Sequence, residues 1–127
     1  MILKRTRNTP YVFLSIKDCT FEIIGPSFSD HITEIYISIL EWIEKKIPLL
    51  NSELKCKFRI DVLNSVSYKN IIEIVMRLDH YSGTGKQIKI LWYYFEDDED
   101  NFAVGKDLSE LFDIPFEIIE EEYESLL

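Results

Sequence analysis

The sequence predicts a single α/β domain over residues 1–127, with a mixed four- to five-stranded sheet, an N-terminal hairpin and helices mainly on one face. Two observations carry this prediction. Apolar patterns along the chain follow the order strand, strand, helix and then alternating strands and helices, which favours parallel pairing with right-handed crossovers. Residues 54–62 alternate strictly between apolar and polar, whereas a strand covered on both faces would show a continuous apolar run.

Residues 11–16 and 19–24 form the predicted hairpin, because each has a strand pattern and Lys17-Asp18 suits the turn between them. Gly25-Pro26 is expected to end the second strand, since proline has no N–H to donate to a neighbouring strand.

The first helix is predicted from about residue 30 to residue 47, with Ser29 or Asp30 as its cap and Pro48 at its end. Its polar residues fall on one side and its apolar residues on the other, as expected for a helix packed on a sheet. The apolar residues are Ile32, Ile35, Tyr36, Ile39, Leu40, Ile43 and Ile47.

The rest of the chain continues the alternation of strands and helices. Residues 53–63 and 87–95 have the period of two that is typical of strands, and a helix is predicted over 66–81 between them. Gly83-Thr84-Gly85 is read as a turn. A third helix is predicted over about 102–112, and a short last strand over 115–119.

Composition excludes several classes of protein. Hydrophobic residues make up 46% of the chain and aromatic residues 13%, enough for a folded core. No apolar run approaches the roughly 20 residues of a membrane span, and the N-terminus lacks the apolar core of a signal peptide. We therefore expect a cytoplasmic protein without membrane insertion.

The net charge of −9 is unevenly distributed. Residues 1–95 contain 13 basic and 10 acidic side chains, whereas residues 96–127 contain one basic and 13 acidic ones. So acidic a C-terminal quarter would repel phosphate backbones, and we expect no nucleic-acid partner.

The acidic run Glu96-Asp97-Asp98-Glu99-Asp100 has two interpretations. It could supply oxygen ligands to Mg²⁺ or Ca²⁺ at the end of a strand. It lacks the ligand spacing and central glycine of an EF-hand, however, and charge runs usually form solvated or interaction surfaces. We predict no catalytic metal here, although the run could belong to a partner surface.

The histidines and cysteines offer weaker signals. His31 and His80 belong to no metal-ligand or nucleophile–base motif and are expected at the surface or at a helix end. Cys19 and Cys56 are expected inside strands, reduced and without metal, because two cysteines are too few for a disulfide framework.

The segment Asn64-Ser65-Val66-Ser67-Tyr68-Lys69 joins a predicted central strand to a helix. Free N–H groups and the helix dipole at such a start can hold an anion. Ser65 or Ser67 could simply cap the helix, or one hydroxyl could accept a phosphate that adds about −1.5 to −2 charges. These residues leave both readings open.

Several segments together resemble a known family. The longest match is Leu91-Trp-Tyr-Tyr-Phe-Glu-Asp-Asp-Glu-Asp100, and the second is Leu63-Asn-Ser-Val-Ser-Tyr-Lys69. Glu34, Tyr36, Trp42 and Asp113-Ile-Pro-Phe116 support them. The chain resembles the SiaC family of bacterial regulatory phosphoproteins over nearly its whole length, from Asn8 to Phe116. The fold of that family is similar to the STAS-like domains of anti-sigma-factor antagonists.

The resemblance assigns roles at the junction. The family motif reads Asn-Thr-Ser-Ser-x-Lys, and its threonine is phosphorylated, which places the acceptor at Ser65 and leaves Ser67 as the runner-up. Asn64, Val66, Tyr68 and Lys69 are then the expected partner-binding residues. The chain departs from the family with serine for threonine at 65, valine for serine at 66, and Phe-Ser-Asp for the usual Tyr-Pro-Glu at 28–30.

The resemblance implies a switch rather than an enzyme. The unphosphorylated form would bind and activate a diguanylate cyclase, while a cognate kinase and a metal-dependent phosphatase would set its phosphorylation state, with no cofactor required. An alternative is a STAS-like anti-sigma-factor antagonist or stressosome-type switch with a different partner. A metal-dependent enzyme using residues 96–100 is the less favoured third class, because the sequence names neither further ligands nor a base.

Overall fold

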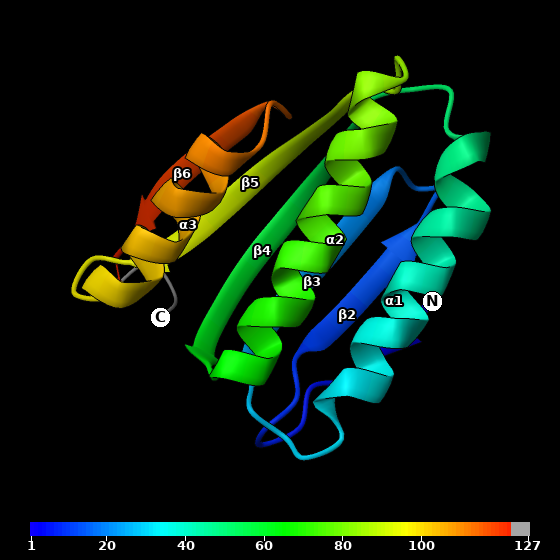
Figure 1. Ribbon diagram of the computed structural model, residues 1–127. Coiled ribbons are helices and arrows are strands. Elements are labelled where there is room, and N and C mark those ends of the chain that lie inside the picture. Colours follow the sequence, from blue (N-terminus) through cyan, green and yellow to red (C-terminus); the bar gives the residue numbers. More distant parts are fainter. Residues whose placement is uncertain (123–127) are drawn as a thin grey trace.

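The structure, a computed structural model, describes residues 1–122 and contains one six-stranded sheet under a single layer of helices (Figure 1). The strands are β1 (Ile2–Leu3), β2 (Tyr11–Ser15), β3 (Thr20–Ser27), β4 (Leu54–Leu63), β5 (Ile88–Phe95) and β6 (Phe116–Glu121). The helices are α1 (Ile32–Lys46), α2 (Ser65–Gly83) and α3 (Glu99–Leu111), with a short 3₁₀ turn at Ile47–Leu49 around Pro48. The predicted α/β class is confirmed.

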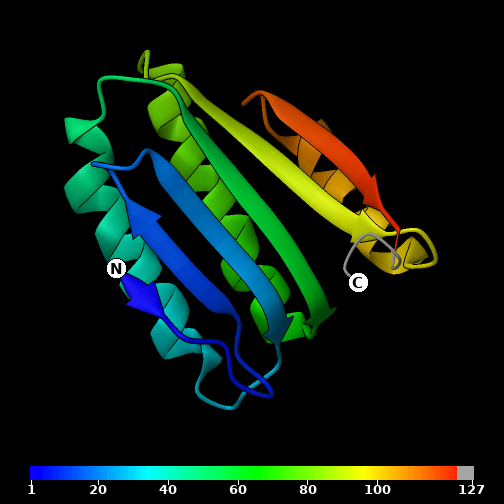
Figure 2. The same ribbon diagram turned by 180° about the vertical axis from the view of Figure 1, so that it is seen from behind.

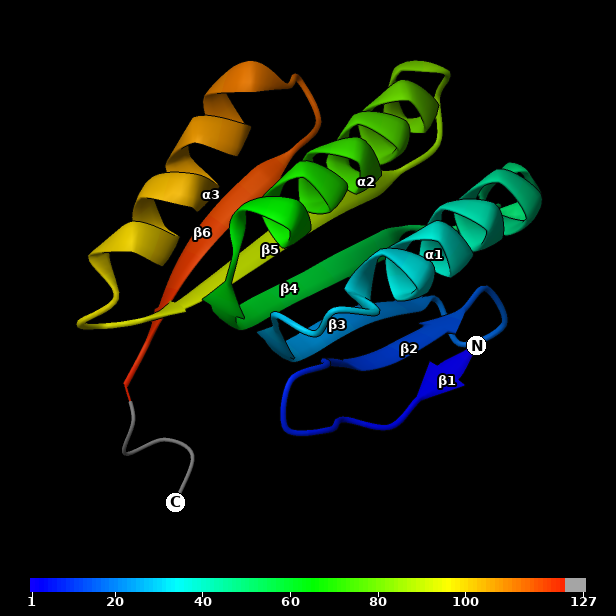
Figure 3. The same cartoon turned by 60° about the horizontal axis from the view of Figure 1, so that its bottom comes forward.

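The strands lie in the sheet in the order in which they occur in the chain. β1, β2 and β3 pair antiparallel, and β3 to β6 pair parallel. The three helices that connect the parallel strands cover the same face (Figure 3), and in residues 1–122 the opposite face carries no helix (Figure 2). Because parallel strands end at a common edge, the β3–α1, β4–α2 and β5–α3 connections lie along one edge of the molecule.

Aromatic side chains form a continuous row through the core beneath the helices. Phe21 of β3 packs edge-on against Phe58 of β4, with ring centroids 5.8 Å apart. Phe58 is also 5.8 Å from Trp92 of β5, which in turn stacks on Phe116 of β6. This row accounts for the apolar side of the alternating pattern that predicted the strands.

The helices are not evenly spaced over the sheet. α1 and α2 pack against each other, whereas α3 lies over β5 and β6 (Figures 1 and 3). α3 comes close to the sheet at Gly105, where a Cβ would be only 2.4 Å from Cδ1 of Trp92. The Trp92 indole N–H also donates to the backbone oxygen of Asn101 at 3.0 Å.

The prediction that Gly25-Pro26 ends the second strand is wrong, because β3 continues through both residues to Ser27. The pairing with β4 shifts between Gly25 and Ser27, and this irregularity accommodates a proline that cannot donate. Gly25 has a φ of +126°, and a Cβ there would meet the Arg5 side chain at 3.1 Å. The extra length brings Ser27 to the edge where the connections lie.

Two further differences concern the N-terminal part of the sheet. The two residues of β1 add a strand beyond the four to five expected, and the Met1 ammonium donates to the backbone oxygen of Leu14 at 2.8 Å. Cys19 lies in the turn between β2 and β3 with a φ of 51°, so the expectation that it belongs to a strand is wrong. Its Sγ is 2.9 Å from Oγ of Ser52. Cys56 does lie in β4 and is buried, and burial raises the pKa of its thiol.

The helices begin at different residues from those expected. α1 begins at Ile32 after His31, so neither Ser29 nor Asp30 occupies the cap position, although Ser29 Oγ accepts the His31 N–H at 3.1 Å. α3 begins at Glu99, three residues earlier than expected. Its cap is Asp98, whose Oδ1 accepts the Asn101 N–H at 3.0 Å.

Candidate functional site

The candidate site is the junction between β4 and α2, at the edge where the parallel strands end (Figure 1). Asn64 has extended backbone angles and caps α2, with its Oδ1 accepting the Ser67 N–H at 2.8 Å. Of the two readings that the sequence left open for these serines, the one in which Ser65 or Ser67 caps the helix is therefore wrong. Ser65 is instead the first helical residue, where backbone N–H groups have no partner within the helix.

Ser67 lies inside the protein, although it is only two residues from Ser65. It is 0% exposed, and its hydroxyl donates to the backbone oxygen of Ser27 at 2.6 Å. The Ser27 hydroxyl donates to Ser67 Oγ at 2.7 Å and lies 2.7 Å from the hydroxyl of buried Tyr36. This chain of hydroxyls joins the end of β3, α1 and the first turn of α2. Burial raises the pKa of Tyr36 to about 12, although its hydrogen bond with Ser27 opposes the shift.

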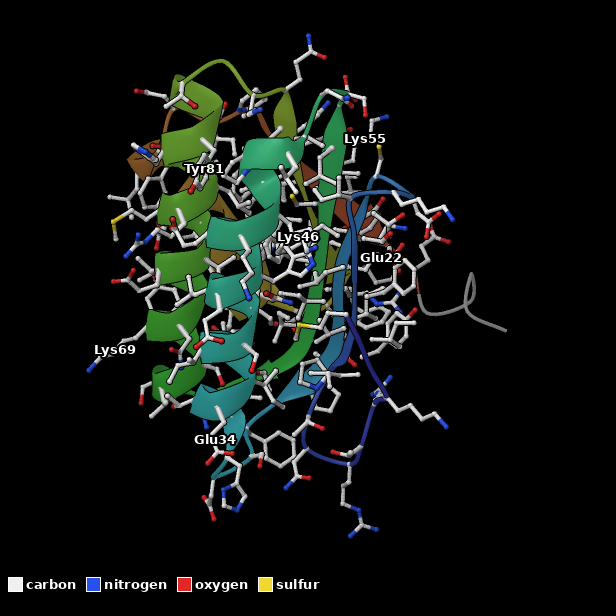
Figure 4. All side chains as sticks on the ribbon, turned by 90° about the vertical axis from the view of Figure 1, so that its right-hand side faces the viewer. Glu22, Glu34, Lys46, Lys55, Lys69 and Tyr81 are labelled. Carbon is white, nitrogen blue, oxygen red and sulfur yellow. The ribbon has the colours of Figure 1, made fainter. Side chains whose placement is uncertain are left out.

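The other predicted residues of the junction point in different directions. Ser65 is exposed, and Val66 is 49% exposed although it is apolar. Lys69 is exposed and extends away from the sheet near the start of α2 (Figure 4). Tyr68 is half-buried and lines a hollow together with residues of α3. The junction thus presents a hydroxyl, an apolar side chain and a cation outward while Ser67 anchors it from within.

A second hollow, of about 180 Å³, lies beside the junction. Its wall on β4 includes Asp61 and Leu63. The opposite wall includes Asp98, which caps α3, and Asn101 and Val104 of α3. Asn101 joins the two walls, because its Nδ2 donates to the backbone oxygen of Ile60 at 2.8 Å.

Asp61 was not among the expected site residues. Its Oδ2 accepts from Arg5 at 3.2 Å, and burial raises the pKa of its carboxyl, an effect that Arg5 and Arg59 oppose. It belongs to the polar half of the alternating strand pattern, so its position in the pattern did not distinguish it from the neighbouring lysines.

The acidic run follows β5, as the sequence indicated, but it is not one loop. Glu99 and Asp100 form the first turn of α3 after the Asp98 cap. Carboxylates at this position stabilise a helix through its dipole, so three of the five residues of the run, Asp98, Glu99 and Asp100, have a role in folding. Residues 1–122 contain no group of three histidine, cysteine or acidic side chains placed to hold a metal ion.

His31 and His80 lie at the two ends of the helical layer and do not come together. His31 is exposed just before α1, and His80 is exposed in the last turn of α2 with its ring 5.3 Å from that of Tyr81. In the part of the chain that the structure describes, no helix is long and apolar enough to cross a membrane.

Together, the single helical layer and the capped helix start define a small α/β domain that presents a serine at the end of a central strand. The chain belongs to the SiaC family of regulatory phosphoproteins, whose family model matches residues 3–121. The expectation from the sequence is confirmed at the level of the family.

The comparisons with individual proteins agree with this family. The chain is 21% identical over 113 residues to an uncharacterised protein of Pseudomonas aeruginosa strain UCBPP-PA14, covering 89% of this chain and 90% of that protein. The fold matches that of Pseudomonas aeruginosa SiaC in a crystal structure where SiaC is bound to the diguanylate cyclase SiaD, and SiaC is the activator of SiaD. The TM-score is 0.88, and the two sequences are 20% identical over 95% of this chain and 99% of the other. SiaC solved separately matches with a TM-score of 0.86 and 19% identity over 95% and 98% of the two chains.

Proposed function

We propose that this chain is a non-enzymatic switch that, when unphosphorylated, binds and activates a diguanylate cyclase. The family supports a regulatory role, and the structural relative bound to a cyclase supports this class of partner. Phosphorylation of Ser65 weakens the complex. A cognate kinase adds the phosphate, a metal-dependent phosphatase removes it, and the exchange takes place in the cytoplasm, where ATP is available to the kinase.

The observation that carries the proposal is the contrast between Ser65 and Ser67. A kinase must bring its phosphate donor to a free hydroxyl, and Ser65 is exposed at the first position of α2. The hydroxyl of Ser67 is buried and bonded to Ser27. Its modification would require the first turn of α2 to open.

A phosphate on Ser65 acts on the partner rather than on the fold. The start of α2 tolerates negative charge, because its free N–H groups and helix dipole favour an anion. A partner docked over the junction, however, meets new charge and bulk beside the exposed side chain of Val66. A loss of roughly 2–3 kcal/mol in binding free energy corresponds to an affinity about 30- to 150-fold lower.

The first test maps the modified residue. The purified protein, its Ser65→Ala variant and its Ser67→Ala variant are incubated with the cognate kinase, and phosphopeptides are identified by mass spectrometry. We expect phosphate on Ser65 in the wild type and in Ser67→Ala, and none in Ser65→Ala. Modification of Ser67 alone, or full uptake by Ser65→Ala, would show that the assignment is wrong.

The second test identifies the partner. Wild-type and Ser65→Glu proteins are used as baits in extracts of the native cells, and captured proteins are assayed for synthesis of cyclic di-GMP. We expect the wild type to capture a diguanylate cyclase and raise its activity, and Ser65→Glu to do neither. Capture of a sigma-factor regulator instead would favour the alternative switch.

A further inference from the structure

The sheet opens between β4 and β5 at the edge where the parallel strands end. The two strands pair only as far as Phe58 and Trp92. β4 nevertheless continues to Leu63 and β5 to Phe95, each still paired with its outer neighbour. The ends of β4 and β5 therefore stand apart (Figure 2). The hollow of about 180 Å³ lies at this opening, because it is lined by β4 beyond Phe58 and by the segment that follows β5.

Two polar side chains at the opening have unmet hydrogen bonds. In the part of the chain that the structure describes, three buried side-chain atoms lack a hydrogen-bond partner, namely Nε of Arg59, Oδ1 of Asp61 and Oδ1 of Asn101. Asp61 and Asn101 line the hollow from opposite walls, and Asn101 is only 7% exposed. Buried polar groups are nearly always hydrogen-bonded. Two free acceptors on one hollow therefore indicate a ligand that donates hydrogen bonds.

The hollow is also negatively charged. Its lining residues include three carboxylates and no basic side chain, the carboxylates being Asp61, Asp98 and Asp100. Arg5 compensates part of this charge, because it donates to Oδ2 of Asp61 at 3.2 Å. Arg59, the next basic residue along β4, binds Glu121 instead at 2.8 Å. Since two carboxylates remain without a cation, a positively charged ligand is favoured over a neutral one.

The geometry of the site selects the kind of cation. No three acidic, histidine or cysteine side chains of residues 1–122 are placed to hold one metal ion. The hollow is also several times larger than a single water molecule requires. Guanidinium and ammonium groups carry several N–H donors each, so one such group can bond to oxygens on both walls.

We propose that this hollow binds the guanidinium or primary ammonium group of a small organic molecule, which donates to Oδ1 of Asp61 and Oδ1 of Asn101. The terminal torsions of these side chains are broad, so a small rotation turns either free oxygen toward the ligand. Open α/β sheets bind ligands in crevices outside the carboxyl ends of their strands, which is where this hollow lies. The site is independent of the proposed switch, because neither Ser65 nor Ser67 lines it.

The test titrates the isotope-labelled full chain with methylguanidinium, butylammonium and the neutral methylurea at constant ionic strength. We expect both cations to shift the NMR amide signals of Ile60, Asp61 and Asn101. Saturation should give a Kd on the order of 1–10 mM, because ligands this small make few contacts. Methylurea should bind at least about tenfold more weakly, and equal binding of methylurea would refute a site for cations.

Three variants separate the hollow from general attraction to an acidic protein. Asp61→Asn and Asp100→Asn each remove one charge from its lining, whereas Asp107→Asn removes one from an exposed position of α3 outside it. We expect binding of methylguanidinium to weaken about tenfold in Asp61→Asn and about threefold in Asp100→Asn, and by less than about 1.5-fold in Asp107→Asn. Asparagine at 61 keeps an oxygen for Arg5, and Asp100 is exposed, so both variants should fold.

Two other results would overturn the inference. Equal weakening in all three variants, or shifts spread over the whole acidic surface, would show that the protein attracts cations without a site. A titration that does not saturate about tenfold above the expected Kd would show that the hollow takes no organic cation. Either result leaves the proposed switch untouched, because the phosphorylation of Ser65 is measured separately.

Discussion

Ser65 and Ser67 differ in their surroundings more than in their chemistry. Both are hydroxyl residues in the first turn of α2, but one is exposed and the other is held by Ser27 inside the protein. A helix turns by about 100° per residue, so positions two apart point to opposite sides. The buried hydroxyls of Tyr36, Ser27 and Ser67 fix the start of α2 to β3 and α1, which holds Ser65 at a constant place on the surface.

Tyr36 should make the protein sensitive to alkaline pH. Its pKa is raised to about 12, so the folded state holds the phenol proton more tightly than the unfolded state does. The resulting stability is fully present below about pH 10, where the unfolded phenol is protonated, and is lost as the pH rises toward 12. The expected loss from this residue is about 2 kcal/mol in the free energy of unfolding by pH 12.

Urea unfolding at several pH values, with Tyr36→Phe as the comparison, measures this contribution. The buried Cys56 thiol also has a raised pKa, and at alkaline pH it lowers the free energy of unfolding of both proteins equally. The difference between their curves of unfolding free energy against pH therefore isolates the contribution of Tyr36. We expect the curves to separate only above pH 10. Parallel curves up to pH 12 would show that folding does not raise the pKa of the Tyr36 phenol.

Among the elements, α3 depends on close approach to the sheet. Gly105 faces the ring of Trp92, which is completely buried and cannot move aside. Asn101, one turn earlier, binds both Trp92 and β4, so α3 is attached to the sheet at two neighbouring points. Asp98 starts the helix from the acidic run that follows β5.

Replacing Gly105 by alanine should therefore destabilise the protein, although alanine favours a helix by about 1 kcal/mol over glycine. The added Cβ overlaps the indole, and overpacking of this kind costs about 1–3 kcal/mol. Gly83→Ala is the control, because a Cβ at the end of α2 meets nothing within 4 Å. Urea unfolding should show a lower midpoint for Gly105→Ala and little change for Gly83→Ala. Equal midpoints for the two variants would contradict the close approach of Gly105 to Trp92.

Across the whole molecule, the helix-free face of the sheet is crossed by ion pairs. Arg59 of β4 lies 5.7 Å from the ring centroid of Phe95 in β5 and binds Glu121 of β6 at 2.8 Å. The two charged side chains are 21% and 18% exposed. The ion pair links β4 to the edge strand β6 across β5, which lies between them.

The substitution Glu121→Gln should cost about 1–3 kcal/mol, because it leaves the partly buried guanidinium of Arg59 without its carboxylate. Glu117→Gln on the same strand provides the control. Glu117 binds Lys89 at 2.9 Å, but its side chain is 51% exposed, and exposed pairs contribute roughly 0–1 kcal/mol. Thermal unfolding should show a clearly lower Tm for Glu121→Gln and a slightly lower Tm for Glu117→Gln. The reverse order would mean that burial does not determine how much each of these ion pairs contributes to stability.

The amino-acid pattern was sufficient to predict most of the architecture. Periods of two and of 3.6 residues are local properties, so the pattern of residues 54–62 indicated a strand with one buried face, and the isoleucines of α1 indicated a one-sided helix. The parallel pairing and the common helical face follow from the order of these elements. The same local reading placed the candidate site at the start of α2 and, through the resemblance, put Ser65 ahead of Ser67.

Other features depend on groups that are distant in the chain. β3 continues through Pro26 because β4 pairs with it around an irregularity, and β1 exists because β2 offers it a partner. Ser67 is buried because Ser27, forty residues earlier, lies against it. Periodicity describes which side of an element is apolar, but burial and hydrogen bonding at a single residue depend on what packs against that side.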